Sequence, residues 1–251
     1  RVMTITSDGF TVKEMTYASG NVSTGSMLCW QWHCNGGTTS SNTDGSKTAT
    51  VQANQDAGFS IVTYAGSGST STVGHGLADT PDMIIFKNRS AANVWATYHQ
   101  GLGNNYKLEL NSNIAQDADG AFMNGTLPTS SVFTVGASVN TNGSGSNYVA
   151  YCFAEKQGYS KFGKYVGNGN ADGPFIYTGF KPAVIILKRT DTAKNWNIIT
   201  GATIQKNVID ERFNLNLGNI QSVGDWADFI SNGFKLRTTN ASINASGGTY
   251  I

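Results

Sequence analysis

The sequence predicts an all-β protein made of tandem antiparallel β-sandwich-like repeat units, with partial units that are open at both ends. Three observations lead to this prediction. Segments recur at a spacing of 101 residues, which indicates a duplicated structural unit. The 251 residues include 30 glycines but only 4 prolines, and 13% of them are charged. Short β-branched and aromatic runs, separated by Gly, Ser, Thr and Asn, are typical of strands joined by turns.

The repeat sets the order of the elements, because matched segments occupy matched places in the two copies. Three pairs keep the 101-residue spacing, a fourth matches after a small shift, and the spacing resumes at Phe133 and Phe234. The four pairs are Tyr64–Gly68 with Tyr165–Gly169, Pro81–Lys87 with Pro182–Lys188, Trp95 with Trp196, and Lys107–Asn111 with Arg212–Asn216. We expect residues that both copies share to build the fold.

The first residues of the chain resemble part of a third copy. Asp8–Val12 parallels Ser131–Val135, and Met27–Trp32 parallels Tyr148–Phe153. Residues 1–35 are therefore predicted to form the back half of a unit.

Residues 36–57 carry almost no large apolar side chains, so we expect a linker or an extended crossing segment there. Repeat unit one is predicted over residues 58–155. Repeat unit two is predicted over residues 156–251 and lacks its last strand. The half-units at both ends suggest either a piece of a longer chain or open ends that strands of neighbouring subunits complete.

Hydrophobic patterns place the strands within each unit. Met83–Phe86 and Val184–Leu187 are apolar on both faces, as central strands are. Val149–Ala154 is apolar throughout and is predicted to be central, whereas its truncated equivalent in unit two would leave a groove open. Alternation over residues 213–217 predicts a half-buried strand. No amphipathic helix is predicted, although Ser222–Ile230 could form one or two helical turns.

The repeat also separates core residues from candidate ligand-binding residues. Trp95 and Trp196 could stack on sugars, but both begin matched strands, so we predict that they pack in the core. Trp30 and Trp32 alternate onto one face and receive the same interpretation. The predicted structural core residues are Trp95, Trp196, Phe133, Phe234, Pro81 and Pro182.

The sequence predicts no catalytic residues, no metal site and no cofactor. His75 and His99 align with Ile176 and Thr200 in the other copy. Neither histidine therefore belongs to the shared scaffold. Asp117–Gly120 opens like a calcium loop, but the acidic residue that would close the loop is missing. The three cysteines lack metal-site spacing and are read as small strand residues; they are Cys29, Cys34 and Cys152.

Recognition is expected in the segments that differ between the copies. These are roughly Gln100–Thr129 and Gly201–Asp228, which we predict to be polar connections on a shared framework. The net charge of +1, with Lys and Arg scattered, supports neither nucleic acid nor a membrane as a partner.

An ordered series of motifs resembles a repeated domain of bacteriophage virion proteins, common in phages of aquatic bacteria and usually described as tail-fibre or structural proteins. The resemblance covers nearly the whole chain. Its motifs are Gly58–Tyr64, Val73–Leu77, Pro81–Ile85, Ser130–Val135, Tyr148–Glu155, Ser160–Gly163 and Asn240–Ile251. No catalytic residues follow from the resemblance.

The resemblance implies a non-enzymatic virion structural protein at the particle surface, a tail fibre or appendage that attaches to a host glycan or protein. The expected partners are other virion proteins and further copies of the chain, in a trimer. A capsid decoration or head-fibre protein is the first alternative. A glycan-binding module of a secreted enzyme is the second.

Overall fold

The structure is a computed structural model, and it describes residues 3–5, 10–12, 32, 34, 37–201, 206–218 and 221–251. In these residues the regular structure consists of strands and one 3-10 turn, η1 (Gln100–Leu102), so the predicted all-β class is confirmed. Neighbouring strands within each sheet run antiparallel. No helix in the described part of the chain is long and apolar enough to cross a membrane.

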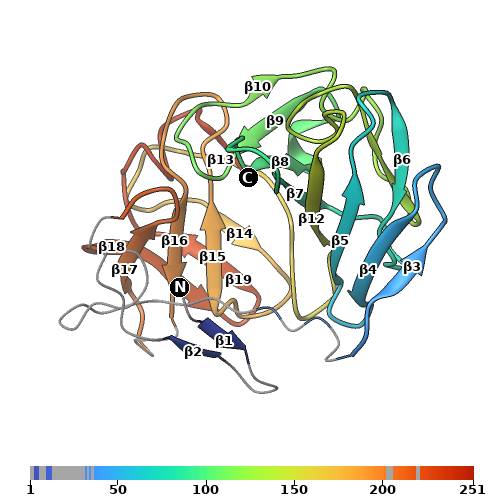
Figure 1. The fold of residues 1–251 in the computed structure, drawn as a ribbon. Helices are drawn as coiled ribbons and strands as arrows, with labels where there is room; N and C mark the ends of the chain where they lie inside the picture. Colours follow the sequence, from blue (N-terminus) through green and yellow to red (C-terminus); the bar gives the residue numbers. More distant parts are fainter. Residues whose placement is uncertain are drawn as a thin grey trace.

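Unit one is built on an eight-stranded sheet with the order β10-β9-β8-β7-β12-β5-β4-β3 (Figure 1). The strands are β3 Ser40–Asn42, β4 Ala49–Asn54, β5 Phe59–Ala65, β7 Met83–Asn88, β8 Ala96–His99, β9 Tyr106–Glu109, β10 Asp117–Ala118 and β12 Asn147–Phe153. β12 pairs with β5 on one side and with β7 on the other. The central position predicted for this strand is confirmed.

A second layer covers one face of this sheet. β6 (Ser71–Gly74) pairs with β11 (Val132–Val135). Alternate residues of the large sheet, such as Val62 and Phe86, join Val73 and Phe133 of the small sheet in one buried cluster. Each large apolar side chain buried in this way contributes about 1.5–3 kcal/mol.

Unit two has a six-stranded sheet in the order β14-β19-β18-β17-β16-β15, and β13 pairs with β20 beside it. The strands are β13 Tyr165–Val166, β14 Phe175–Tyr177, β15 Val184–Leu187, β16 Asn197–Thr200, β17 Ile209–Asn214, β18 Ser222–Ile230, β19 Gly233–Leu236 and β20 Thr249–Tyr250. Its core contains Ile185, Leu187, Ile199, Phe229 and Phe234.

The two copies share contacts as well as sequence. The backbone N–H of Trp95 donates to the side chain of Asn111 at 2.9 Å, and that of Trp196 donates to Asn216 at 3.0 Å. These asparagines lie 16 and 20 residues after their tryptophans. The structure thus confirms the small shift in spacing between the copies.

Residues 36–57 differ from the expected linker, because they supply the edge strand β3 and its neighbour β4. Small apolar side chains are enough for this. Ala49 and Val51 alternate into the core and are 2% and 3% exposed. A segment without large apolar residues can therefore still form a half-buried strand.

The predicted helical turns at Ser222–Ile230 are wrong, because these residues form β18. Pairing with β17 and β19 on both sides overrides the weak local preference for a turn. The strand predicted over residues 213–217 begins earlier and ends at Asn214, and Leu217 is 42% exposed.

Both ends of the chain bear on the predicted partial units. β1 (Met3–Ile5) and β2 (Phe10–Val12) pair with each other, and most of residues 1–35 lie outside the described residues. The last strand of unit two, expected to be missing, is present as the short strand β20, which occupies the place that β12 has in unit one.

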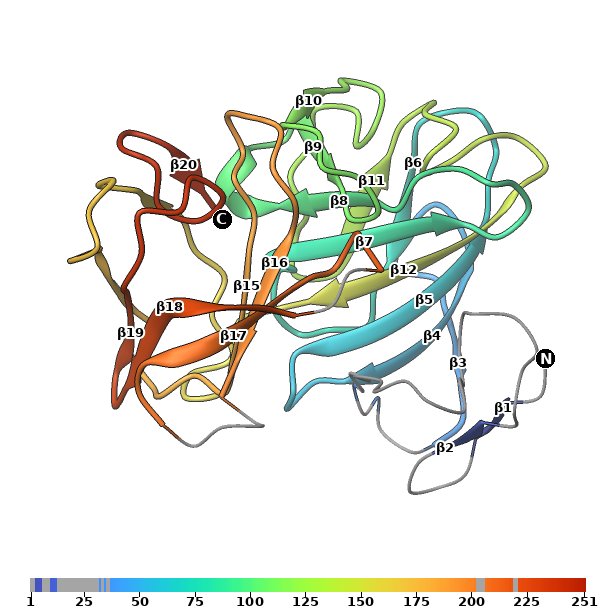
Figure 2. The ribbon, with the colours of Figure 1, turned by 90° about the vertical axis from the view of Figure 1, so that its left-hand side faces the viewer.

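The two units lie side by side (Figure 2). They meet through a small apolar cluster. Leu108 of unit one packs with Trp196 and Ile251 of unit two. The Trp196 indole N–H also donates to the Glu109 carbonyl at 2.8 Å. Trp196, which directly precedes β16, is thus buried against β9 of unit one.

Candidate functional site

Each unit contains a buried network in which a stacked tyrosine pair ties a turn to the sheet. In unit one the rings of Tyr64 and Tyr148 stack with centroids 5.5 Å apart. The Tyr64 hydroxyl donates to the Thr141 carbonyl at 2.7 Å. The Tyr148 hydroxyl accepts from the Gly143 N–H at 2.7 Å and donates to the Val139 carbonyl at 2.8 Å.

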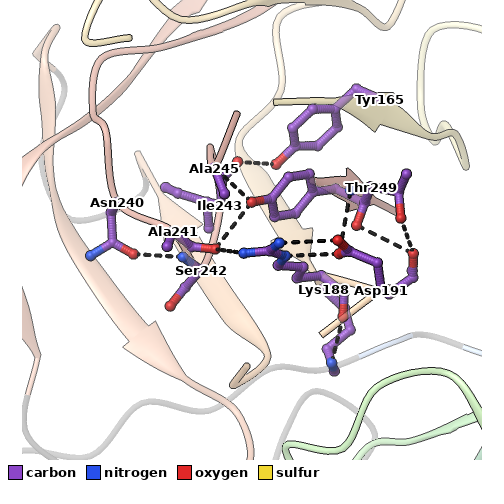
Figure 3. Close-up of polar contacts among 12 residues, drawn as sticks. Tyr165, Lys188, Asp191, Asn240, Ala241, Ser242, Ile243, Ala245 and Thr249 are labelled. Atoms are coloured by element: carbon purple, nitrogen blue, oxygen red, sulfur yellow. Dashed lines mark hydrogen bonds and ion pairs between the residues drawn. The ribbon is translucent and has the colours of Figure 1, made fainter. Parts of the chain in front are cut away.

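Unit two repeats this network with Tyr165 and Tyr250, whose centroids are 4.8 Å apart (Figure 3). Tyr165 donates to the Ile243 carbonyl at 2.7 Å, and Tyr250 accepts from the Ala245 N–H at 2.7 Å. Burial raises the pKa of Tyr64 and of Tyr165 well above the usual value, so both hydroxyls stay neutral and act as hydrogen-bond donors.

A buried asparagine completes each network. Asn142 donates to the carbonyls of Ser69 and Gly136, and its oxygen accepts from the Ser67 N–H. Asn244 holds the equivalent turn in unit two and, like Asn142, is 0% exposed. We call the tyrosine pair and this asparagine the Tyr–Asn lock, formed by Tyr64, Tyr148 and Asn142 in unit one and by Tyr165, Tyr250 and Asn244 in unit two.

The lock of unit two carries an additional ion pair. The Arg189 guanidinium contacts Asp191 through two bonds of 2.8 and 3.0 Å and donates to the Ala241 carbonyl at 3.2 Å (Figure 3). The guanidinium holds the pKa of Asp191 below its usual value. In unit one Asn88 takes this place and donates to the Val139 carbonyl and to Tyr148. The ion pair therefore holds the Arg189 side chain against the turn at Ala241 and is part of the structural framework.

Lys188 follows β15 and is completely buried. Its ammonium donates to the Arg189 carbonyl at 2.6 Å, and burial lowers its pKa to about 8. Lys87, the equivalent residue in unit one, donates to the Asn93 carbonyl in the same way. A lysine that binds a backbone carbonyl in both copies is part of the framework.

His75 and His99 are buried apart from each other and bind backbone groups. His75 Nδ1 accepts from the Leu77 N–H at 3.1 Å, and its Nε2 faces the Thr129 carbonyl at 3.1 Å. His99 Nδ1 accepts from the Gly101 N–H at 3.0 Å. Burial lowers the pKa of His75 and brings that of His99 to about 4, so both rings are neutral at pH 7.

No three His, Cys, Asp or Glu side chains of the described residues gather as a metal-ligand group. Asp117 pairs with Lys107, and Asp119 accepts from the Ser138 hydroxyl. Cys152 is buried, which raises its pKa to about 12 and keeps the thiol protonated. Cys29 lies outside the described residues.

The predicted core residues differ in their surroundings. Phe133 and Phe234 are 0% and 4% exposed, and Pro81 and Pro182 are also buried. Trp196 is 2% exposed because unit one covers it.

Trp95 departs from the expected core position and is only half-buried, stacking on Tyr151 with centroids 6.3 Å apart. Trp32 is 51% exposed and lies against Phe59 and Phe153. Its expected partner Trp30 lies outside the described residues.

The segments expected to be variable loops are largely framework. Gln100–Thr129 contains η1, β9 and β10, and its Phe122 and Met123 are 0% exposed. Within Gly201–Asp228 lie β17 and most of β18. Side chains that enter the core, such as Phe122, Met123 and Trp226, explain why the described parts of these segments belong to the framework.

A polar groove of about 470 Å³ lies along β3 and β4, outside the predicted recognition segments. Asp56 is the charged residue among those that line it. The others are uncharged, namely Thr38, Ser40, Asn42, Val51, Gln52, Ala53, Asn54, Gln55 and Gly76. Amide and hydroxyl groups of this kind hydrogen-bond neutral polar ligands. The sequence did not indicate this groove, because residues 36–57 were predicted to be a linker.

The chain matches one family model over residues 1–251, described as a domain of unknown function, DUF7483. No curated protein and no solved structure matches it.

Proposed function

The chain belongs to the DUF7483 family, and since that family carries no assigned activity, we propose from its residues that it is a non-enzymatic structural protein of a bacteriophage virion. In this role it is a tail fibre or similar appendage on the particle surface and presents its β-units for attachment to a host. The proposal includes self-association into a homo-oligomer, with other virion proteins as further partners.

One observation carries the non-enzymatic part of the proposal. The buried polar groups found in both units, in the Tyr–Asn locks and at Lys87 and Lys188, bind backbone turns. His75 and His99 have no histidine at the equivalent positions of unit two and are also bonded to the backbone. A rigid duplicated framework is what an adhesive appendage needs. The phage assignment is supported by the resemblance of the motif series.

The groove along β3 and β4 is the surface that we assign to host contact. Its uncharged amides and hydroxyls suit the hydroxyl groups of a glycan, and the net charge of +1 provides no steering toward an anionic partner. A host-surface glycan is therefore the expected ligand class.

Labelling on intact particles tests the virion role. An antibody raised against the purified chain should decorate the tail or an appendage in electron micrographs. Label on the capsid shell would contradict a tail-fibre role and support the alternative role as a capsid decoration protein. Particles without label, from a phage whose genome encodes the chain, would contradict a virion role.

Cell binding tests the attachment surface. The purified protein should bind host cells and block infection, and Thr38→Trp, which fills the groove, should abolish both effects. Thr70→Trp is the matched control, because Thr70 is exposed and does not line the groove. Equal binding by the two variants would show that the groove is not the contact surface.

A further inference from the structure

One position of the repeat holds a cation in both units. Lys107 of β9 corresponds to Arg212 of β17 in the matched segments of the two copies. The two side chains also occupy the same place in their sheets. Lys107 lies opposite Asp117 of β10, and Arg212 lies opposite Ser222 of β18, which runs beside β17 in Figure 2. The surroundings of the two cations can therefore be compared residue by residue.

In unit one the chain itself neutralises this cation. The Lys107 ammonium lies 2.5 Å from Asp117 Oδ2 and 3.6 Å from Glu109 Oε1. Lys107 is only 4% exposed. A buried charge without a partner of opposite charge is strongly unfavourable. The two carboxylates therefore make the burial of Lys107 possible.

Both carboxylates are replaced by neutral side chains in unit two. Ser222, opposite Arg212 on the neighbouring strand, takes the place of Asp117. Asn214, two residues after Arg212 on β17, takes the place of Glu109. The cation is thus kept in the second copy, whereas the anions that pair with it in the first copy are not.

Arg212 forms no ion pair with the part of the chain that the structure describes. Asp210, two residues earlier on β17, is paired with Lys206 at 2.7 Å. Arg237, which follows β19, shows the usual arrangement, because its guanidinium binds Asp228 at 2.6 Å. Burial lowers the pKa of the Arg212 guanidinium below its usual value, as expected for a cation without a carboxylate beside it. The charge of Arg212 is therefore available to an anion from outside the chain.

The guanidinium of Arg212 also has hydrogen-bond donors in excess. Its Nη1 donates to Asn240 Oδ1 at 3.3 Å. Its Nε is buried without a partner, and its Nη2 has no hydrogen bond to any described residue. Unpaired donors on a charged group are unfavourable, and a guanidinium pairs best with the two oxygens of a carboxylate. The donors of Arg212 therefore fit the same kind of group that Lys107 has beside it.

Trp226 holds the guanidinium in one orientation. The Cζ atom of Arg212 lies 4.1 Å from the centroid of the Trp226 ring. Trp226 is 7% exposed, and its indole N–H donates to the Asp210 carbonyl at 2.9 Å. Stacking on this fixed indole sets the plane of the guanidinium. Because the side chain is already ordered, less conformational entropy is lost when it binds a ligand.

The side chains around Arg212 are neutral and polar. Asn214, Ser222 and Asn240 each lie next to Arg212, and all four residues are partly exposed. Amides and hydroxyls of this kind donate to and accept from the hydroxyl groups of a ligand. A carboxylate with hydroxyl groups beside it is the chemistry of an acidic sugar.

We propose that Arg212, Asn214, Ser222 and Asn240 form a binding site for an acidic sugar. The Arg212 guanidinium binds the carboxylate, and the three neutral side chains bind the hydroxyl groups. In unit one Asp117 supplies this carboxylate from within the chain, whereas in unit two the ligand supplies it. The inference goes beyond the proposed function, because the groove along β3 and β4 is a separate surface for uncharged groups.

A variant that supplies the carboxylate from the chain tests the site. Ser222→Asp should pair with Arg212 as Asp117 pairs with Lys107, and Ser222→Asn is the matched control of equal size without the charge. The probe is glucuronate, titrated into the purified protein in a calorimeter. The natural chain and Ser222→Asn should bind it, and Ser222→Asp should bind it about tenfold more weakly or less. Equal affinity of the two variants, or a natural chain that does not bind glucuronate, would overturn the proposal.

Ligands that lack one part of the acidic sugar test its chemistry on the natural chain. Glucose lacks the carboxylate and acetate lacks the hydroxyl groups, so each should bind about tenfold more weakly than glucuronate or less. Glucose that binds as tightly as glucuronate would show that no carboxylate is recognised. Acetate that binds as tightly would show that no sugar is recognised. Either result would overturn the proposal.

A second pair of variants tests the cation without changing Ser222. Arg212→Gln should lower the affinity for glucuronate to that for glucose. Arg237→Gln is the matched control, since the Arg237 guanidinium already binds Asp228, and it should bind glucuronate as the natural chain does. Equal affinity of the two variants would show that Arg212 does not bind the carboxylate. These titrations use neither particles nor host cells, so failure of this site is distinguishable from failure of the virion role.

Discussion

At the scale of single residues, the stability of this protein depends on buried polar groups that bind backbone turns. Tyr148 is 0% exposed, and its hydroxyl bonds to Gly143, Val139 and Asn88. Leaving such partners buried and unpaired costs about 1–3 kcal/mol each. The sequence marked Tyr64 and Tyr165 as repeated residues, but nothing local in it showed which turns they bind.

Removing one hydroxyl of the Tyr–Asn lock should destabilise the fold. We expect Tyr148→Phe to lower the free energy of unfolding by roughly 1–3 kcal/mol, because it leaves the Gly143 N–H without its acceptor. Urea unfolding measures the change. Tyr159→Phe is the control, since Tyr159 is 63% exposed and should change little. A Tyr148→Phe chain as stable as the control would show that the network contributes nothing.

The neutral histidines should make the protein less stable in acid. The pKa of His99 is about 4 in the fold, below the usual value of 6.5, so the unfolded chain binds more protons between these values. Stability is therefore full above pH 6.5 and falls as the pH drops toward 4.

The variant His99→Asn isolates this effect. The asparagine oxygen can take the place of Nδ1 as acceptor for the Gly101 N–H, but it does not titrate. Urea unfolding of both chains at pH 7.5 and pH 5 should show a smaller loss of stability in the variant. An equal loss in both chains would assign the acid sensitivity to other groups.

At the scale of elements, close contacts between turns and strands explain several glycines. A Cβ on Gly66 would lie 2.1 Å from the Gly143 carbonyl oxygen, and one on Gly167 would lie 2.3 Å from that of Ala245. The turn that each lock holds thus packs directly on the strand end beside it. Both units have the same close approach between a glycine and a turn carbonyl, so this packing of the turn belongs to the repeated unit.

Alanine at these glycines should destabilise both units. We expect Gly66→Ala and Gly167→Ala each to cost about 1–3 kcal/mol, because the turn must move to admit the methyl group. Thermal unfolding followed by circular dichroism measures the effect. Gly120→Ala is the matched control, since a Cβ there meets nothing within 4 Å. Destabilisation by the control alone would contradict the packing argument.

At the scale of the whole molecule, the two units have separate cores and meet through a small apolar cluster and a few hydrogen bonds, such as that from the Gln116 N–H to the Thr190 carbonyl at 2.8 Å. The buried clusters of the units are separate, and Leu108, Trp196 and Ile251 form a third cluster where the units meet. Trp196 also donates its indole N–H across the contact. The cooperativity of unfolding should therefore depend on this tryptophan.

Loss of the junction should separate the unfolding of the two units. Calorimetry of the natural chain should show one transition, and Trp196→Ala, which costs about 3–5 kcal/mol as a buried aromatic, should show two. Trp95→Ala is the matched control in unit one, because Trp95 is half-buried and stacks on Tyr151 of its own unit. A single transition in Trp196→Ala would mean that the units are coupled elsewhere.

The all-β class, the duplicated unit, the central strand β12 and the shift between the copies could be predicted from the sequence alone. Alternation and repetition are patterns that can be read directly along a chain. Tertiary structure decided the rest. β18 became a strand through its neighbours on both sides, and Trp95 and Trp196 differ because unit one covers only the latter. The Tyr–Asn locks join residues such as Tyr64 and Thr141, 77 positions apart. Partners at such distances leave no local pattern, so only folding brings them together.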